Sequence, residues 1–231
     1  LDADVCDKAQ VELAEGSIEN GFPAISLLNP DTAACHTTEY LKLRVVPPPT
    51  LERVEPPMGC VAEGDREFVI EGTDFLKIDD VMPVITIGGM DFEPSKMDGC
   101  EPLDTQGHMV ERCTSLTFTV AKDRLVPDLY EVTVTNPAPA GCDDAATGLL
   151  RLVPPPAIGE IVPPLVCVAD SDRTLVIHGS DFLVVEGEVP AVEVDGEALD
   201  PKVVEAKDCE DLEVDSLGVQ KCATLSVTIA K

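Results

Sequence analysis

The stretch PPPTLERVEPPMGCVAEGDREFVIEGTDF, residues 47–75, returns at residues 154–182 as PPPAIGEIVPPLVCVADSDRTLVIHGSDF. The triple proline, the second proline pair, the cysteine and the closing G-[ST]-D-F motif keep their places in both copies. The offset is 107 residues, whether it is counted between the two cysteines (167 − 60) or between the two closing phenylalanines (182 − 75). A repeat of this length predicts one structural unit copied along the chain.

The repeat divides the chain into three segments. Residues 1–46 align on 108–153 without a gap, cysteines included, and both stretches run directly into a triple proline. We therefore predict the closing half of a unit at 1–46, a complete unit at 47–153 and the opening part of another unit at 154–231. These ranges are called the first, middle and third segments below.

Hydrophobic residues alternate with a period of two in the middle segment, which is typical of half-buried β-strands. The expected strands are Leu51–Val54, Glu67–Glu71, Val84–Ile87, Leu116–Val120, Tyr130–Thr135 and Leu149–Val153. Six or seven short strands in a unit of this size predict an all-β fold made of immunoglobulin-like antiparallel β-sandwiches in tandem. The triple prolines are expected to act as short, stiff linkers that hold successive units apart and in line.

Two short motifs predict turns in the segments. We expect the G-[ST]-D-F motif to close a strand, with its aspartate capping the backbone and its phenylalanine filling the core. Gly88-Gly89 and Asp195-Gly196 are typical of tight hairpins in which both turn residues have positive φ.

Composition narrows the classes of function. Sixteen Lys and Arg against 44 Asp and Glu give a net charge of −28, which disfavours binding to nucleic acid or to an anionic membrane. The same charge would attract divalent cations or basic partners. Aromatic residues make up only 3% and tryptophan is absent, so the chain holds little material for stacking on sugars. No apolar run reaches the roughly 18 residues that a membrane span needs.

The order of motifs resembles the IPT/TIG domain, the immunoglobulin-like module of plexins, certain transcription factors and many bacterial surface proteins. The resemblance rests on the proline-rich opening, the G-[ST]-D-F turn, TIGG, LTFTV and then YEVTVTNP, and it covers essentially the whole chain. It implies a role as a spacer, stalk or adhesive array outside the cell. The DNA-binding branch of the family disagrees with the acidic charge, and four cysteines per unit depart from its intracellular members.

Cysteines at repeated positions predict disulfides and an oxidising compartment. Cys100 and Cys113 bracket a loop of twelve residues, and Cys209 and Cys222 bracket an equal one, so each pair is expected to be joined. Cys60 is then expected to pair with Cys142 inside the unit, with a Cys142–Cys167 bridge across the linker as the rival. Partners for the remaining three are expected in another unit or outside the chain: Cys6, Cys35 and Cys167. Zinc is disfavoured because no C-x-x-C pair occurs.

Other polar residues carry weaker expectations. Asp79 and Asp80 form a calcium candidate in the loop after the second strand, although a solvated acidic loop explains them as well and the third segment has Glu186-Gly187 there. The three histidines share no repeat position, and His178 is expected at a solvated strand end. No catalytic residues and no cofactor are predicted, and the chain is not expected to be an enzyme.

The leading hypothesis is a structural or adhesive repeat protein, part of a disulfide-stabilised stalk or filament on a bacterial surface. The alternatives are a ligand- or receptor-binding module that uses loops at the ends of the sandwich, and an accessory domain of a secreted hydrolase. The expected partners are neighbouring repeats or other copies of the chain, with no nucleic acid and no membrane insertion. Two modes of assembly stay open: a window of a longer array, and a chain that polymerises by completing a sandwich with a neighbour's strands.

Overall fold

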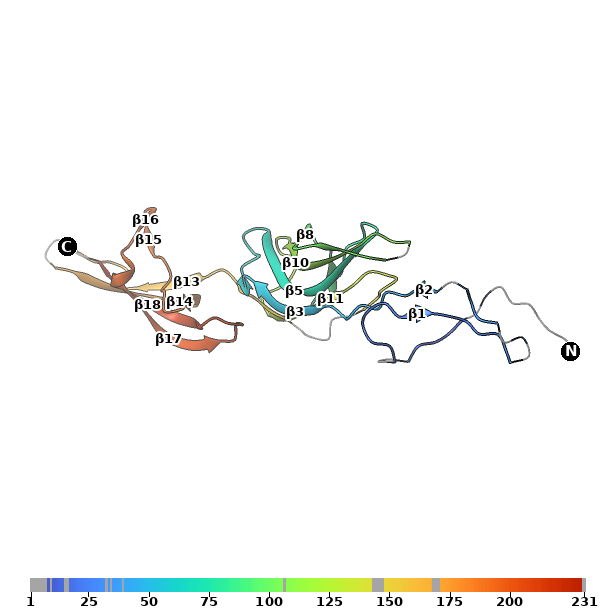
Figure 1. The fold of residues 1–231 in the computed structure, drawn as a ribbon. Helices are drawn as coiled ribbons and strands as arrows, with labels where there is room; N and C mark the ends of the chain where they lie inside the picture. The colour runs from blue at the N-terminus through green and yellow to red at the C-terminus, as the bar shows by residue number, and fades with distance from the viewer. Residues whose placement is uncertain are drawn as a thin grey trace.

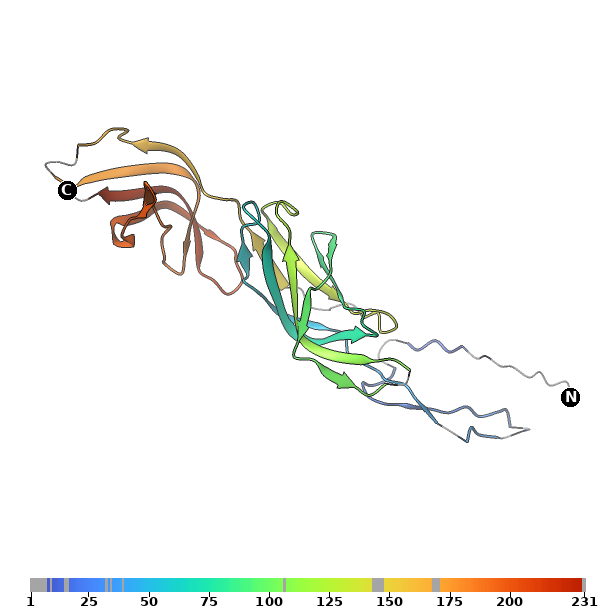
Figure 2. The ribbon, with the colours of Figure 1, turned by 90° about the horizontal axis from the view of Figure 1, so that it is seen from above.

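The computed structural model describes residues 8, 10–14, 17–31, 33, 35–38, 40–105, 107–142, 148–167 and 171–229. This part of the chain is essentially all-β, with several antiparallel sheets, no α-helix and one short 3₁₀ helix, η1 (Pro201–Val203). Every sheet is made of strands from a single segment. The three segments follow one another along the molecule (Figures 1 and 2). No described helix has the length and apolar character required to span a membrane.

The middle segment contains two five-stranded sheets. The strands of one are β3 (Thr50–Glu55), β5 (Arg66–Ile78), β10 (Val110–Val120) and β8 (Lys96–Asp98), in that order, with β9 (Glu101–Leu103) also paired to β10. The other has the order β4 (Met58–Gly59), β12 (Gly148–Leu152), β11 (Leu129–Thr135), β6 (Val84–Ile87) and β7 (Met90–Phe92). Neighbouring strands are antiparallel except for β4 and β12. This arrangement is consistent with a β-sandwich.

Side chains from both sheets form one core. Phe68, Phe75 and Phe118 of the first sheet are fully buried together with Val132 and Leu150 of the second. Along β11 the buried residues alternate with more exposed ones, the period-two pattern that predicted this strand, whereas in β10 the consecutive residues Leu116–Phe118 are all buried. All six expected strands are present. The short strands β4, β7, β8 and β9 were not anticipated because two or three residues are too few to show a period.

The expectation that the G-[ST]-D-F motif ends a strand is wrong. Strand β5 runs through the motif, and its pairing with β10 shifts register there, as in a β-bulge. Asp74 takes the positive φ of 61°, whereas Gly72 is required because an added Cβ would lie 2.0 Å from the carbonyl oxygen of Thr50. Phe75 fills the core as predicted.

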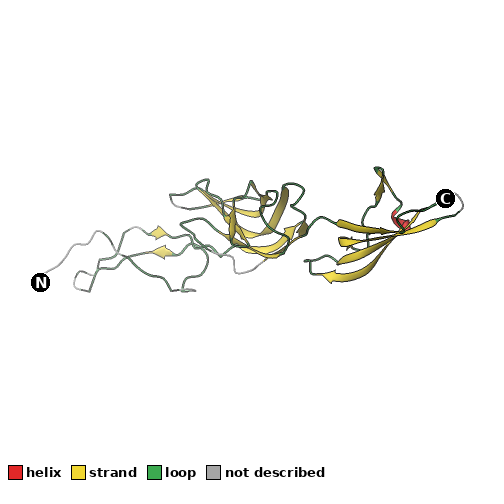
Figure 3. Cartoon of the chain, turned by 180° about the vertical axis from the view of Figure 1, so that it is seen from behind, coloured by secondary structure: helices red, strands yellow, loops and turns green. Residues whose placement is uncertain are grey.

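The third segment has one four-stranded sheet and a separate hairpin (Figure 3). The sheet has the order β13 (Ala157–Val162), β14 (Arg173–Val185), β18 (Val219–Ile229) and β17 (Val204–Leu212), and the hairpin joins β15 (Glu193–Val194) to β16 (Glu197–Ala198). The bulge recurs in β14, where Asp181 also has a φ of 61°. The two hairpin turns, Gly88-Gly89 and Asp195-Gly196, have positive φ at both residues as predicted.

The described part of the first segment holds one hairpin, β1 (Ala24–Ile25) paired with β2 (Leu41–Lys42). It is the repeat counterpart of β11 and β12, since Ile25 corresponds to Val132 and Leu41 to Gly148. An isolated bridge between Gly21 and Val45 extends it toward the middle segment.

Candidate functional site at the junctions between segments

Two disulfides hold the outer strands of the sheets. Cys100 bonds to Cys113 with an S–S distance of 2.07 Å, and Cys209 bonds to Cys222 at 2.04 Å. These are the two pairs that the constant loop length indicated. Cys113 and Cys222 are buried in β10 and β18, the central strands of their sheets. Each disulfide therefore ties the periphery of a sheet to the sheet's central strand.

The predicted Cys60–Cys142 bridge is wrong, because both cysteines are free. Cys60 follows β4, where its carbonyl oxygen accepts a hydrogen bond from Arg66 Nε at the start of β5. The carbonyl oxygen of Cys142 instead accepts from the Asn136 backbone N–H, and the side chain of Asn136 binds Leu76 near the other end of β5. At about 3.3 Å per residue, the stretch of β5 between Arg66 and Leu76 spans roughly 30 Å.

The other two free cysteines of the described residues, Cys35 and Cys167, repeat the surroundings of Cys142 and Cys60. Cys35 and Cys167 are free and exposed, so the rival Cys142–Cys167 bridge is not formed either. The carbonyl oxygen of Cys167 accepts from Arg173 Nε at 2.7 Å, which repeats the contact at Cys60. Cys35 repeats the Cys142 loop, since its carbonyl oxygen accepts from the Asn29 backbone N–H. Cys6 lies outside the described residues.

Cys60 faces the third segment. It lines a hollow of ≈ 230 Å³ with Val153 and the triple proline Pro154–Pro156 on one side and Asp181, Phe182 and Leu183 on the other. The backbone N–H of Val153 donates to the carbonyl oxygen of Gly59, next to Cys60, at 3.0 Å. A thiol therefore lies at the junction between the middle and third segments, where the sequence alone placed only a linker.

The first segment meets the opposite end of the middle segment. Val46 packs with Leu76, Ile78, Val110 and Ala140 in a small cluster that is separate from the main core. Ala140 belongs to the loop of Cys142, and its carbonyl oxygen accepts a hydrogen bond from the Cys142 thiol. The Cys142 loop therefore lies at the junction with the first segment.

The equivalent arginines of the two junctions make different contacts. Arg151 Nε donates to the carbonyl oxygen of Glu213 at 3.0 Å, so β12 of the middle segment reaches a loop of the third. Its counterpart Arg44 lies over the ring of Phe22, 4.3 Å from the ring centre, and beside Asp104 in a shared hollow. Asp104 occupies the place of Glu213, because the cysteines on either side give an offset of 109 (209 − 100 and 222 − 113). Equivalent residues therefore lie at both junctions, but the hydrogen bond of Arg151 is not repeated, because Arg44 Nε is buried without a hydrogen-bond partner.

The acidic pair Asp79 and Asp80 binds cationic and backbone groups of the protein itself. Asp79 contacts His108 Nδ1 and accepts a hydrogen bond from the Met109 backbone N–H at 2.8 Å. Asp80 pairs with Lys77 at 2.9 Å. The hydrogen bond from His108, followed by that from Met109, lowers the pKa of Asp79 below its ordinary value of 3.8. Among the described residues no cluster of three or more metal-ligating side chains occurs.

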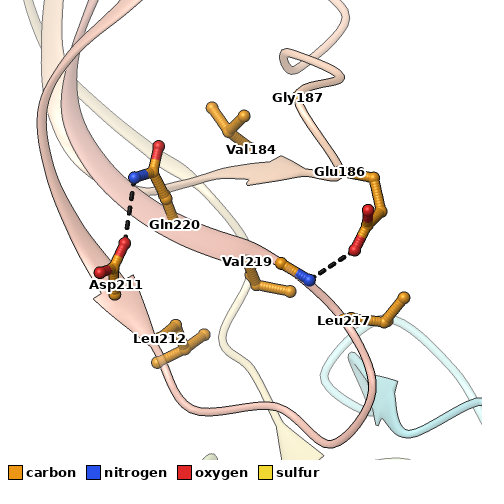
Figure 4. Close-up of a pocket in the computed structure, with 9 residues that line it drawn as sticks. Val184, Glu186, Gly187, Asp211, Leu212, Leu217, Val219 and Gln220 are labelled. Carbon is orange, nitrogen blue, oxygen red and sulfur yellow. Dashed lines mark hydrogen bonds between the residues drawn. The ribbon is translucent and has the colours of Figure 1, made fainter.

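The Asp79 contact recurs in the third segment. Glu186, its repeat counterpart, accepts a hydrogen bond from the Gly218 backbone N–H through Oε1, beside a hollow of ≈ 510 Å³ (Figure 4). A hollow of ≈ 530 Å³ lies at the matching place beside Asp79. The lining differs, since Lys77 is replaced by Val184 and His108 by Leu217. Both segments therefore have a carboxylate that caps a loop. The sequence concealed this correspondence because Asp79-Asp80 is replaced by Glu186-Gly187.

The histidines do not form a common site. His108 contacts Asp79, and His178 Nδ1 lies 3.3 Å from Thr224 Oγ1. His178 is exposed as expected, but it lies inside β14 and not at a strand end. His36 is exposed and forms an isolated bridge with Leu28.

Comparison with known proteins leaves the resemblance as an expectation. Neither the family models nor the curated proteins that were searched give a match to this chain.

Proposed function

We propose that this chain is a stretch of an extracellular structural protein, an array of IPT/TIG-type immunoglobulin-like sandwiches in a stalk or filament on a bacterial surface. In this proposal the segments 1–46, 47–153 and 154–231 belong to successive units. The proline-rich stretches join the units, and the disulfides replace part of the stability that a small core lacks.

The observation that carries the proposal is that the segments repeat their structure, since the bulge with a φ of 61° and the disulfide to the central strand both recur in the middle and third segments. The arginine contact differs between the junctions, since Arg151 Nε donates to the Glu213 carbonyl oxygen and Arg44 Nε has no hydrogen-bond partner. Val46 and Val153 are both followed directly by a triple proline and both lie where one segment meets the next. Repeated units that contact only their neighbours form an extended structure.

The cysteines and the charge support the same proposal. Two disulfides at equivalent positions are compatible with an oxidising environment. A net charge of −28 keeps a long chain soluble and makes compact packing of the segments against one another unfavourable. The pocket that recurs in the middle and third segments gives less support to ligand binding. Its residues Lys77 and His108 are replaced in the third segment by Val184 and Leu217.

Two measurements test this proposal. Small-angle X-ray scattering of the monomer should give an extended particle with the segments in a row, and a compact globule would contradict it. Antibodies against residues 47–153 should label intact cells that produce the protein. Labelling that appears only after the cells are permeabilised would reject the extracellular assignment.

A further inference from the structure

The free cysteines of the described residues fall on two positions of the repeat. Cys60 and Cys167 occupy one position, and Cys35 and Cys142 occupy the other. In the middle segment the first position lies at the junction with the third segment, and the second lies at the junction with the first segment. In an array of such units, each junction therefore receives one thiol from the unit before it and one from the unit after it.

The valine before each triple proline marks the same place at the two junctions. Val153 donates its backbone N–H to the carbonyl oxygen of the residue before Cys60, at 3.0 Å. Val46 is the counterpart of Val153, and it packs on the same small cluster and lines the same hollow as Ala140 of the Cys142 loop. One junction thus shows a cysteine of the first kind beside this valine, and the other shows the loop of the second kind.

The loop of Cys142 is fixed to strand β5 through Asn136. The side chain of Asn136 accepts a hydrogen bond from the Leu76 N–H at 2.8 Å and donates to the Asp74 carbonyl oxygen at 2.9 Å. The backbone N–H of Asn136 donates to the carbonyl oxygen of Cys142 at 2.9 Å, which closes the loop. The cysteine is therefore held near the bulge of β5.

The equivalent bulge of the third segment lies at the junction with the middle segment. Its residues Asp181 and Leu183 are the counterparts of the two that Asn136 binds, and both line the hollow of ≈ 230 Å³ that Cys60 also lines. A unit built like the middle segment would hold its counterpart of Cys142 beside this bulge. The valine and the bulge thus place the two thiols in the same hollow.

We propose that successive units are joined by a disulfide between Cys60 of one unit and the counterpart of Cys142 in the next. The inference rests on the proposed function, in which one unit follows another along the chain. The middle segment uses both of its free thiols in this way, Cys60 toward the unit after it and Cys142 toward the unit before it. The triple proline and the disulfide then hold each junction at two points.

The accessibility of these thiols favours a bridge over free cysteines. Cys60 and Cys142 are both partly exposed, whereas a cysteine that serves only as a small apolar side chain is normally buried. The two disulfides already formed are compatible with an oxidising environment, in which accessible thiols do not stay reduced. A partner thiol in the same hollow gives them a stable oxidised form.

The reaction requires an oxidant of the disulfide class, such as oxidised glutathione. The two thiols lose two protons and two electrons, and one S–S bond forms between the units. The S–S bond of the oxidant breaks, and the oxidant takes up the protons and electrons to become two thiols. The same oxidant forms the bridge between Cys100 and Cys113, so the junction needs no separate chemistry.

Disulfide mapping of the protein from cells that produce it tests the pairing. Free thiols are alkylated at once, and the protein is digested without reduction and analysed by mass spectrometry. We expect the Cys60 peptide to be linked to a peptide of the following unit that has the Asn-Pro and Cys pattern of residues 136–142. Recovery of Cys60 as an alkylated thiol would overturn the proposal, as would a link from Cys60 to Cys142 or Cys167 of this sequence.

A lengthened chain tests the geometry by itself. Residues 123–153 are repeated directly after Lys231, which corresponds to Lys122, so that the third segment is followed by the closing part of a unit. The original Cys142 is replaced by Ala, so that a link to the repeated copy can be recognised. After oxidation in a glutathione buffer, we expect the Cys60 peptide to be linked to the repeated Cys142, with a loss of two free thiols per chain.

Two further variants of the lengthened chain are the controls. Cys60→Ala should leave the repeated Cys142 free, whereas Cys167→Ala should leave the link unchanged, because Cys167 and the repeated cysteine belong to one unit. The Cys209–Cys222 disulfide reports that the third segment has folded. A repeated Cys142 that stays free while Cys209–Cys222 forms, or that joins Cys167, would overturn the proposal. None of these outcomes changes the extended shape or the location at the cell surface, which test the proposed function.

Discussion

Asn136 Oδ1 accepts a hydrogen bond of 2.8 Å from the backbone N–H of Leu76, immediately after the bulge in β5. The amide nitrogen of the same side chain donates to the carbonyl oxygen of Asp74 at 2.9 Å. Asn136 is almost completely buried, so it satisfies two backbone groups that the bulge removes from the ladder. The Asn136-Pro137 pair directly after β11 thus fixes the bulge in the G-[ST]-D-F motif.

Replacing Asn136 by Ala should destabilise the middle segment by about 2–4 kcal/mol, because two buried backbone groups lose their partners. Urea denaturation followed by circular dichroism would measure the change. The control is Asn29→Ala at the equivalent but exposed position, which should change the free energy of unfolding by no more than about 0.5 kcal/mol. Equal effects of the two variants would contradict this account of the bulge.

The Cys100–Cys113 bridge should stabilise the folded state by about 3 kcal/mol, as loop-closure entropy predicts for a separation of 13 residues. The double variant Cys100→Ala/Cys113→Ala should lose that amount in denaturation without reductant. The pair Cys60→Ala/Cys142→Ala is the matched control, since these cysteines form no bridge. A comparable loss in the control would mean that Cys60 and Cys142 are joined after all.

A disulfide between cysteines that are close in the sequence could be predicted, whereas the distance between cysteines at opposite ends of a segment could not. The loop between Cys100 and Cys113 keeps its length in the third segment, so a short-range bridge followed from spacing alone. Cys60 and Cys142 were matched only because each lacked a partner. Their separation along β5 depends on the bulge that keeps one long strand continuous, and no local signal distinguishes such a bulge from a turn.

Contacts between segments were also beyond prediction. Arg151 and Glu213 are bound through a side chain and a backbone carbonyl, a contact that leaves no trace in residue type at position 213. The repeated Asn29-Pro30 and Asn136-Pro137 pairs did carry a usable signal. A polar residue that recurs at one position of a repeat indicates a side chain that the fold uses, and at the buried position Asn136 makes two hydrogen bonds to the backbone.

Gly72→Ala should destabilise the middle segment by about 1–3 kcal/mol, because the new methyl group would lie 2.0 Å from the Thr50 carbonyl oxygen. That oxygen belongs to β3, which pairs with β5 at this point, so it can retreat only if the pairing opens. Gly64→Ala is the control, since an added Cβ there meets no atom within 4 Å. Thermal unfolding would show a lower midpoint for Gly72→Ala alone. An unchanged unfolding midpoint in both variants would refute the close approach of Gly72 to the Thr50 carbonyl oxygen.

The last prediction concerns Asp79 and pH. Its pKa is lowered from 3.8, first by the hydrogen bond from His108 and then by that from the Met109 backbone N–H. Between the lowered pKa and 3.8, the folded chain therefore binds fewer protons at this carboxyl than the unfolded chain. The resulting stability is fully present above pH 3.8 and is lost as the pH falls through the lowered pKa.

Asp79→Asn should consequently unfold at a lower urea concentration than the wild type at pH 7. The difference between the two midpoints should stay constant down to the region of pH 5 and shrink below pH 3.8. Other carboxylates titrate alike in both proteins, so they cancel from the difference. Asp80→Asn is the neighbouring control, because its exposed pair with Lys77 contributes little. A difference that persists or grows as the pH falls toward 2.5 would show that Asp79 acts through its shape and not through its charge.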